Sequence, residues 1–122
     1  MATYHVLIAD DVDSVRSLLA RIITRTYPSA RISVVADGDE ALEIYTQEGA
    51  SLIITDNEMP RMDGLSLVAT IRERSLYVPI IMISSNSALA AQAHNAGANA
   101  FLGKPFLIHD FVQTVTRFLP AQ

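Results

Sequence analysis

The stretch Leu52-Ile53-Ile54-Thr55-Asp56 is a short run of apolar and β-branched residues that ends on an aspartate. Such a run, without alternating polar residues, is typical of a strand in a parallel sheet whose two faces are both covered by helices. In open sheets of this kind, functional side chains collect just beyond the carboxyl ends of the strands. The stretch therefore indicates both a fold class and the place where chemistry is expected.

Four further runs of the same kind lie before and after this stretch. Together the predicted strands are His5–Ala9, Arg31–Val35, Leu52–Thr55, Pro79–Ser84 and Ala100–Leu102. The segments between them have helical spacing of apolar residues, most clearly over 15–23 and 111–119. Because each parallel crossover needs a helix, the pattern predicts an α/β fold. We expect a doubly wound, five-stranded parallel sheet in the order 2-1-3-4-5 with five helices, as in flavodoxin-like proteins.

Three local signals mark the ends of the predicted helices. Asp37 with Glu40 three residues later resembles a capping box at the start of the second helix. Pro28 closes the first helical region, and Gly97 is expected as the left-handed residue after the fourth helix.

Composition limits the classes of protein to which the chain can belong. Its 122 residues are 50% hydrophobic and 18% charged, which predicts one globular domain over residues 1–122. The absence of cysteine excludes disulfides and thiolate metal sites. No run approaches the ~20 apolar residues of a membrane span and no leader opens the sequence, so we expect a cytoplasmic protein without membrane contact. The net charge of −4, without a basic cluster, disfavours direct binding of nucleic acid.

Chemically active side chains follow four of the predicted strands. Asp10 and Asp11 follow the first strand and Asp56 follows the third. Ser84 ends the fourth strand, and Lys104 lies two residues after the fifth. Since the first and third strands flank the switch point of the 2-1-3-4-5 order, we expect these side chains to converge in one pocket.

The expected pocket is strongly acidic. Three carboxylates within about 6 Å repel one another by roughly 3 kcal/mol per pair at an effective dielectric constant near 20. Such a cluster requires a cation or shared protons, and oxygen ligands without His or Cys suit Mg²⁺. Lys104, the single lysine among nine basic residues, offsets only part of this charge. Its position suggests a point charge held near a phosphate.

Each of these residues, taken alone, has a purely structural explanation. Asp10 and Asp11 could cap a helix, Asp56 could belong to a solvated turn, and the Ser84 hydroxyl could bond its own backbone. Lys104 could be an ordinary surface lysine. Their joint placement beyond four strands favours the functional interpretation. The three histidines lie outside this pattern, and no glycine-rich nucleotide-binding motif is present.

The combined motifs resemble the response-regulator receiver family over essentially the whole chain. The matching segments are Val6–Asp11, Leu52–Gly64, Pro79–Ser85 and Ala96–Phe106. An acidic pair, a strand-end Asp followed by Met-Pro and Asp-Gly, a Ser and a Lys-Pro are highly specific in this order. The resemblance implies a CheY-like receiver domain of a two-component phosphorelay, which is a signalling switch rather than an enzyme. It would be either a stand-alone single-domain protein or a piece of a longer chain.

The resemblance also implies roles for the acidic residues. Asp56 would be the phosphoacceptor, a carboxylate nucleophile that forms an aspartyl phosphate. Mg²⁺ would be held by Asp11, by Asp56 and by the backbone carbonyl of Glu58, with Asp10 acting through water or orienting its neighbour. The phosphodonor would be a sensor histidine kinase or a phosphotransfer protein.

Further roles implied by the resemblance fall on the fourth and fifth strands. Lys104, with a cis bond before Pro105, would pair with one phosphoryl oxygen, and the Ser84 hydroxyl would bond another. Ser84 would then move and leave space for Phe101, which replaces the usual tyrosine of the switch. Because Phe101 lacks the hydroxyl, we expect a looser switch. A downstream protein target would bind the face formed by the fourth helix, the fifth strand and the fifth helix.

Three residues are expected to tune the site. Ser85 stands where the family usually has Ala or Gly, so access to the phosphate is slightly narrower. Glu58 and Asn86 stand at the variable positions that tune dephosphorylation in this family.

Three other functions compete with this interpretation. A phosphatase of the haloacid-dehalogenase kind uses a similar residue set, but its nucleophile follows the first strand and its core is larger. A binding module of the same fold that is never phosphorylated is disfavoured by the intact residue set. Flavin binding is disfavoured because Asp10 and Asp11 would repel a flavin phosphate.

Overall fold

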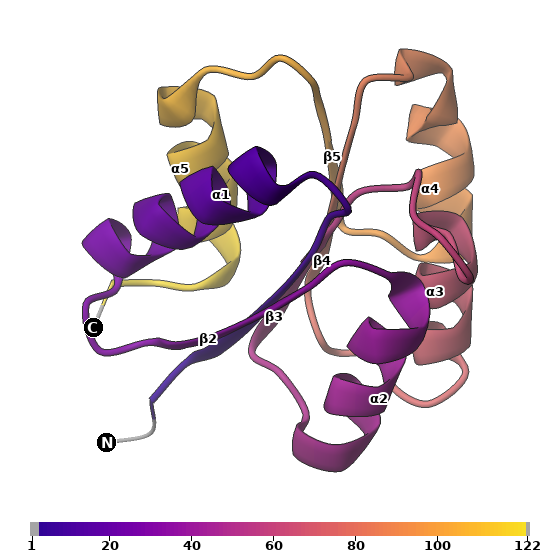
Figure 1. The fold of residues 1–122 in the computed structure, drawn as a ribbon, viewed down its shortest axis with the longest axis horizontal. Coiled ribbons are helices and arrows are strands. Elements are labelled where there is room, and N and C mark those ends of the chain that lie inside the picture. Colours follow the sequence, from indigo (N-terminus) through magenta and orange to yellow (C-terminus); the bar gives the residue numbers. More distant parts are fainter. Residues whose placement is uncertain (1–2, 122) are drawn as a thin grey trace.

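The computed structural model describes residues 3–121 and contains one parallel sheet with helices on both faces (Figure 1). The strands are β1 His5–Ala9, β2 Arg31–Val35, β3 Leu52–Thr55, β4 Ile80–Ser84 and β5 Ala100–Gly103. The helices are α1 Asp13–Thr26, α2 Gly38–Glu48, α3 Gly64–Arg72, α4 Ala90–Ala96 and α5 Ile108–Phe118, with a 3₁₀ turn, η1 Ser87–Leu89, before α4. Residues 1–2 and 122 of the predicted domain lie outside the described residues.

The sheet has the predicted strand order. Its strands lie in the order β2-β1-β3-β4-β5, and every neighbouring pair is parallel. Two strand ends differ slightly from the prediction, which used hydropathy alone. β4 begins at Ile80 rather than Pro79, because proline has no N–H to give to the ladder. β5 continues to Gly103, which pairs with Ser84, because hydrogen bonding extends beyond the apolar run.

Two hydrophobic cores cover the two faces of the sheet. Every residue of the inner strands β1, β3 and β4 is buried. On one face α1 and α5 pack over the sheet around Phe111, and on the other α2, α3 and α4 pack around Leu67 and Ile71 (Figure 1). Truncation of a buried aromatic such as Phe111 to alanine costs about 3–5 kcal/mol. These cores hold the strand ends rigidly in place.

The predicted helix boundaries are confirmed with one exception. The Asp37 side chain accepts a hydrogen bond of 2.8 Å from the Glu40 N–H, but the Glu40 carboxylate lies near Arg61 instead of completing the box. Gly97 ends α4 with φ of 119°, in the left-handed region. Pro28 follows directly after the residue that caps α1.

No helix between residues 3 and 121 combines the length and apolarity that a membrane crossing requires. All five strands run in one direction, so their carboxyl ends meet at one edge of the sheet. The residues beyond that edge form the site described next.

Candidate functional site

The carboxyl ends of β1 and β3 bring three carboxylates together. One oxygen from each of Asp10, Asp11 and Asp56 lies within 4.8 Å of the other two. The Asp10 N–H donates to the Val35 carbonyl at 3.1 Å, and the Asp56 N–H donates to the Ala9 carbonyl at 2.8 Å. Hydrogen bonds to neighbouring strands thus fix the backbone of Asp10 and Asp56, the two buried members of the acidic cluster.

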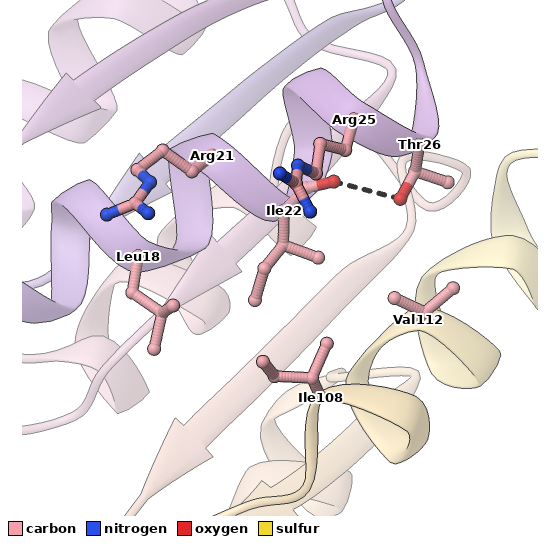
Figure 2. Close-up of a pocket in the computed structure, with 7 residues that line it drawn as sticks. All are labelled: Leu18, Arg21, Ile22, Arg25, Thr26, Ile108 and Val112. Atoms are coloured by element: carbon pink, nitrogen blue, oxygen red, sulfur yellow. Dashed lines mark hydrogen bonds between the residues drawn. The ribbon is translucent and has the colours of Figure 1, made fainter.

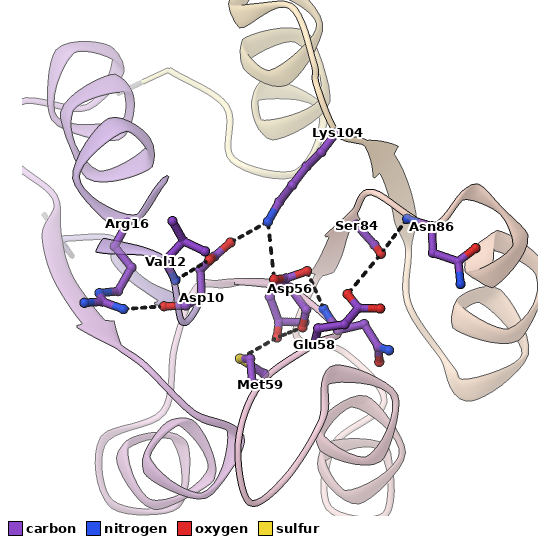
Figure 3. A network of polar contacts seen from close by, with 11 residues as sticks. Asp10, Val12, Arg16, Asp56, Glu58, Met59, Ser84, Asn86 and Lys104 are labelled. Carbon is purple, nitrogen blue, oxygen red and sulfur yellow. Dashed lines mark hydrogen bonds and ion pairs between the residues drawn. The ribbon is translucent and has the colours of Figure 1, made fainter. Parts of the chain in front are cut away.

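Both carboxylate oxygens of Asp10 are engaged. The residue is 1% exposed; Oδ1 accepts the Val12 N–H at 2.9 Å, and Oδ2 accepts the Lys104 ammonium at 2.9 Å (Figure 3). The Asp10 carbonyl also accepts a hydrogen bond from Arg16 at 2.6 Å. Asp11 is exposed and forms no side-chain hydrogen bond within residues 3–121. Neither aspartate caps α1, whose N-cap residue is Val12, so the purely structural explanation as helix caps is wrong.

Asp56 is a buried carboxylate with incomplete charge compensation. It is 5% exposed; Oδ1 accepts the Asn57 N–H at 2.8 Å, and Oδ2 lies 3.3 Å from Nζ of Lys104. Burial raises the pKa of Asp56, and the negative charge of Asp10 raises it further, against the opposing effect of Lys104. The ionised form of Asp56 would therefore be favoured by an additional cation.

Among residues 3–121, Lys104 is the cation that forms ion pairs with the carboxylates of Asp10 and Asp56. Burial lowers its pKa, but the hydrogen bond to Asp10 and the charges of Asp10 and Asp56 outweigh this effect, so the pKa of Lys104 lies above its ordinary value. One ammonium facing three carboxylates leaves a net negative pocket. The Lys104–Pro105 peptide bond is cis, as predicted.

The Ser84 hydroxyl links two residues that the sequence suggested only as separate tuning positions. It is fully buried, donates to the Glu58 carboxylate at 3.4 Å and accepts the Asn86 N–H at 3.1 Å (Figure 3). Ser85, the third suggested position, is exposed beside it. Phe101 lies on β5, partly buried against the core beneath α2, α3 and α4.

Several residues around the pocket were not singled out from the sequence. The Asn57 carbonyl and side-chain oxygen accept the N–H groups of Gly64 and Leu65, at 2.9 and 3.0 Å. A Cβ atom at Gly64 would lie 2.2 Å from the Asp56 carbonyl oxygen, so only glycine fits there. The Asp63-Gly64 pair is typical of a helix start, and this signal could have indicated that Asn57 bonds the first N–H groups of α3. Arg61, which binds Asp37, has no comparable local signal.

The histidines lie elsewhere, as predicted. His5 is at the amino end of β1, where its ring forms a hydrogen bond of 2.8 Å with the Ser33 hydroxyl. His94 and His109 are exposed on α4 and α5.

The donor set suits a hard divalent cation. The oxygens of Asp10, Asp11 and Asp56 converge without a nitrogen or sulfur ligand among them. At an effective dielectric constant near 20, charges at such separations repel by about 3 kcal/mol per pair, which a bound cation relieves. These residues could therefore hold Mg²⁺.

Comparison with known proteins gives one consistent family. The sequence pattern of the response regulator receiver domain matches residues 6–116. The DNA-binding transcriptional regulator NtrC of Klebsiella pneumoniae is 35% identical over 112 residues, which are 90% of this chain and 24% of that protein. The transcriptional regulatory protein PdtaR of Mycobacterium tuberculosis is 34% identical over 113 residues, which are 91% of this chain and 54% of that protein. The chain thus spans about a quarter to about half the length of these relatives.

Solved structures agree over almost the entire chain. The chemotaxis response regulator CheY4 of Vibrio cholerae superimposes with a TM-score of 0.87 at 28% identity, covering 97% of this chain and 100% of that chain. The receiver domain of the Francisella response regulator 1452 gives 0.82 at 27% identity, covering 95% and 96%. With its acidic pocket at the carboxyl ends of β1 and β3, this chain belongs to the response regulator receiver domains of two-component systems, phosphorylation switches that take phosphate from histidine kinases.

Proposed function

We propose that this chain, as one receiver domain over residues 1–122, accepts a phosphoryl group on Asp56 in a Mg²⁺-dependent reaction. A cytoplasmic location is part of this proposal. The observation that carries it is the buried Asp56 carboxylate at the end of β3, which shares the Lys104 ammonium with Asp10 and has a raised pKa. A carboxylate whose negative charge is only partly compensated by its neighbours is suited to a reaction in which a cation and a phosphoryl group bind to it.

The reaction is nucleophilic substitution at phosphorus. One Asp56 oxygen forms a bond to phosphorus while the bond from phosphorus to the imidazole nitrogen of a phosphohistidine breaks, and the electron pair returns to that nitrogen. The Lys104 ammonium, 3.3 Å from Asp56 Oδ2, is within reach of a phosphoryl oxygen attached there. Mg²⁺, when bound, would supply positive charge that shields the phosphoryl oxygens.

The hydrogen bonds of the acidic pair support different roles for its two members. Both oxygens of Asp10 already have protein donors, which supports an orienting or water-mediated role. Asp11 is exposed and has no side-chain partner within residues 3–121, which supports its role as a direct ligand. We assign the remaining protein ligands to the Asp56 carboxylate and the Glu58 backbone carbonyl.

The switch begins at the Ser84 hydroxyl. To bond a phosphoryl oxygen, this hydroxyl must give up its long bond of 3.4 Å to Glu58. Phe101 then repacks into the space behind Ser84. Helix α4 buries one side chain, Ala93, so its displacement exposes little apolar surface. A downstream protein target would bind the altered face formed by α4, β5 and α5.

An exposed apolar surface beside the pocket supports a protein as phosphodonor. Val12 and Leu107 lie close in sequence to Asp10 and Lys104, and Leu18 and Ile108 continue the apolar surface along α1 and α5. We call these four residues the α1–α5 surface. Patches of this kind on otherwise polar proteins mark sites of protein contact.

A groove deepens this surface between the two helices. Leu18 and Ile22 of α1 face Ile108 and Val112 of α5 across a space of about 250 Å³ (Figure 2). Two further lining residues, Arg21 and Arg25, have no ion pair among residues 3–121, and no acidic residue lines the groove. The chemistry favours a donor that presents an apolar helix face flanked by acidic side chains.

Beryllofluoride, which substitutes for a phosphoryl group, tests the proposal. With Mg²⁺ present, we expect amide shifts in nuclear magnetic resonance spectra around Asp56 and across α4, β5 and α5. The same addition to the Asp56→Asn variant should leave these amides unchanged. A wild-type protein whose amides do not shift would favour a binding module that is never phosphorylated. Equal amide shifts in the Asp56→Asn variant would mean that another residue is the acceptor.

A further inference from the structure

The loop that leaves Asp56 is held at its base and at its apex. This loop, residues 57–63, connects β3 to α3. At its base, Asn57 bonds the first N–H groups of α3 through its carbonyl and its side chain, at 2.9 and 3.0 Å. The base is therefore closed by contacts within the same β–loop–α unit.

The apex of the loop is bonded to a different part of the fold. The Arg61 guanidinium donates from Nε and Nη2 to Asp37 Oδ2, at 3.2 and 2.5 Å. Beside this ion pair, the Gly38 N–H donates to the Met62 carbonyl at 3.1 Å. Asp37 is 3% exposed and caps α2, so the apex is attached to the junction of β2 and α2. We call the Arg61–Asp37 ion pair the loop latch.

The backbone on both sides is shaped for this approach. Arg61 has φ of 67°, in the left-handed region that residues other than Gly and Asn rarely adopt. A Cβ atom at Gly38 would lie 2.3 Å from the Met62 carbonyl oxygen, so only glycine allows the two segments to meet. The Glu40 N–H hydrogen bond and Arg61 together hold the pKa of Asp37 below its ordinary value, so the Asp37 side of the latch is ionised at neutral pH. Arginine at a position whose backbone conformation favours glycine indicates that the arginine side chain helps to hold the loop.

Glu58 lies between the two anchors. Its carboxylate accepts the Ser84 hydroxyl, and its carbonyl is the ligand assigned to Mg²⁺ above. With the base closed by Asn57 and the apex tied to Asp37, the backbone at Glu58 has little freedom. Released from Asp37, the apex would keep two polar contacts with α2 among the described residues, the Gly38–Met62 hydrogen bond and the longer Arg61–Glu40 ion pair of 3.7 Å.

We propose that Arg61 is a positioning residue, which through its ion pair with Asp37 holds the loop so that Glu58 faces the metal and Ser84. This inference rests on the proposed function, because it assigns Arg61 to the same reaction. It adds a contact between the β3–α3 loop and the start of α2. Loss of the latch weakens Mg²⁺ binding and slows phosphoryl transfer without removing any reacting group.

Three variants separate positioning from stability. Arg61→Gly and Arg61→Asn both tolerate the left-handed backbone and remove the guanidinium, so they preserve the fold while releasing the latch. Asp37→Asn keeps an oxygen that can accept the Glu40 N–H but loses the charge that Arg61 binds. Arg74→Ala is the matched control, because this exposed arginine contacts Thr46, away from the pocket.

Each variant is titrated with Mg²⁺ in the absence of a phosphodonor, and binding is monitored by amide shifts in nuclear magnetic resonance spectra. A thermal unfolding curve of each variant measures its stability. We expect Mg²⁺ affinity to fall about 10-fold in Arg61→Gly and Arg61→Asn, the lower end of the range for residues that support metal ligands. Unfolding temperatures should be preserved, and Arg74→Ala should match the wild type. Because the two residues act as one pair, Asp37→Asn combined with Arg61→Gly should fall no further than either single variant.

Unchanged Mg²⁺ affinity in both Arg61 variants overturns the inference. If the wild-type chain is phosphorylated on Asp56 and these variants match it in affinity and rate, the latch alone fails and the proposed function stands. If the wild type shows no Mg²⁺ response at all, the latch and the proposed metal requirement fail together.

Discussion

Asp10 and Asp56 share one cation, because Nζ of Lys104 lies 2.9 Å from the first carboxylate and 3.3 Å from the second. The ammonium therefore compensates each aspartate only in part. Addition of a phosphoryl group to Asp56 would bring more negative charge within reach of the Lys104 ammonium. The energetic consequences of this shared arrangement are measurable in the unmodified protein.

Removing the Asp56 charge should stabilise the fold. We expect Asp56→Asn to raise the free energy of unfolding at neutral pH by about 0.5–2 kcal/mol, the usual range for a single stabilising substitution. Burial raises the pKa of Asp56 above its usual value of 3.8, so the native state holds more protons than the unfolded state between the two pKa values. The contribution of Asp56 to stability consequently falls as pH rises through this window.

Urea unfolding at several pH values checks this prediction. The difference between Asp56→Asn and the wild type should widen from acid to neutral pH. Glu73→Gln, at an exposed acidic residue that ends α3, serves as the control and should show no such trend. A wild type as stable as Asp56→Asn at neutral pH would mean that its neighbours fully compensate the Asp56 charge.

Mg²⁺ should stabilise the native state through Asp11. At ten times the dissociation constant, binding adds about 1.4 kcal/mol to the free energy of unfolding. The Asp11→Asn variant should lose most of this increment, because it removes the carboxylate with no protein partner among the described residues. Unfolding in MgCl₂ and in NaCl of equal ionic strength separates binding from screening. Equal stabilisation of wild type and Asp11→Asn would exclude Asp11 as a ligand.

Charges placed on the α1–α5 surface should affect protein donors alone. We expect Leu18→Asp and Ile108→Asp to slow transfer from a histidine-phosphorylated phosphotransfer protein by about 10-fold or more, the effect of losing an anchoring apolar contact. Transfer from acetyl phosphate should be unchanged, because this small donor needs no docking surface. Leu76→Asp is the matched control, since Leu76 is 74% exposed at the opposite end of β4. Equal losses with both donors would indicate damage to the fold.

Phe101 should respond to the phosphate substitute by packing alone. We expect beryllofluoride to shift the Phe101 rotamer balance incompletely, and Phe101→Tyr to shift it further because the hydroxyl gains a partner in one rotamer. Aromatic ¹³C resonances of the labelled ring report the populations. Nearly equal Phe101 populations with and without beryllofluoride would contradict a switching role for this residue.

The sheet and the convergence of the acidic residues were predictable from the sequence for one physical reason. Strands covered on both faces need continuous apolar runs, and the residues after each run necessarily meet at one edge of a parallel sheet. Asp10 and Asp56 follow such runs directly, and Lys104 follows one after a single glycine. Hydropathy predicted the end of β5 less accurately. The ladder continues through Gly103, because hydrogen bonding rather than side-chain burial determines where the strand ends.

Other contacts could not be predicted because they depend on how separate loops pack. Arg61 and Asp37 are 24 residues apart, and no local sequence pattern predicts an arginine with a left-handed backbone conformation. The link from Glu58 to Ser84, whose hydroxyl also accepts the Asn86 N–H, likewise depends on how the segment after β3 packs against the end of β4. Leu18 has the spacing of a core residue, yet it lies at the edge of the apolar stripe of α1 and lines the groove.

The mass of the intact protein after incubation with acetyl phosphate and Mg²⁺ tests the central proposal most directly. We expect the wild-type chain to gain one phosphoryl group, and the Asp56→Asn variant to gain none under the same conditions. A wild-type chain that gains no mass, or an Asp56→Asn variant that gains as much as the wild type, would contradict the assignment of Asp56 as the phosphoacceptor.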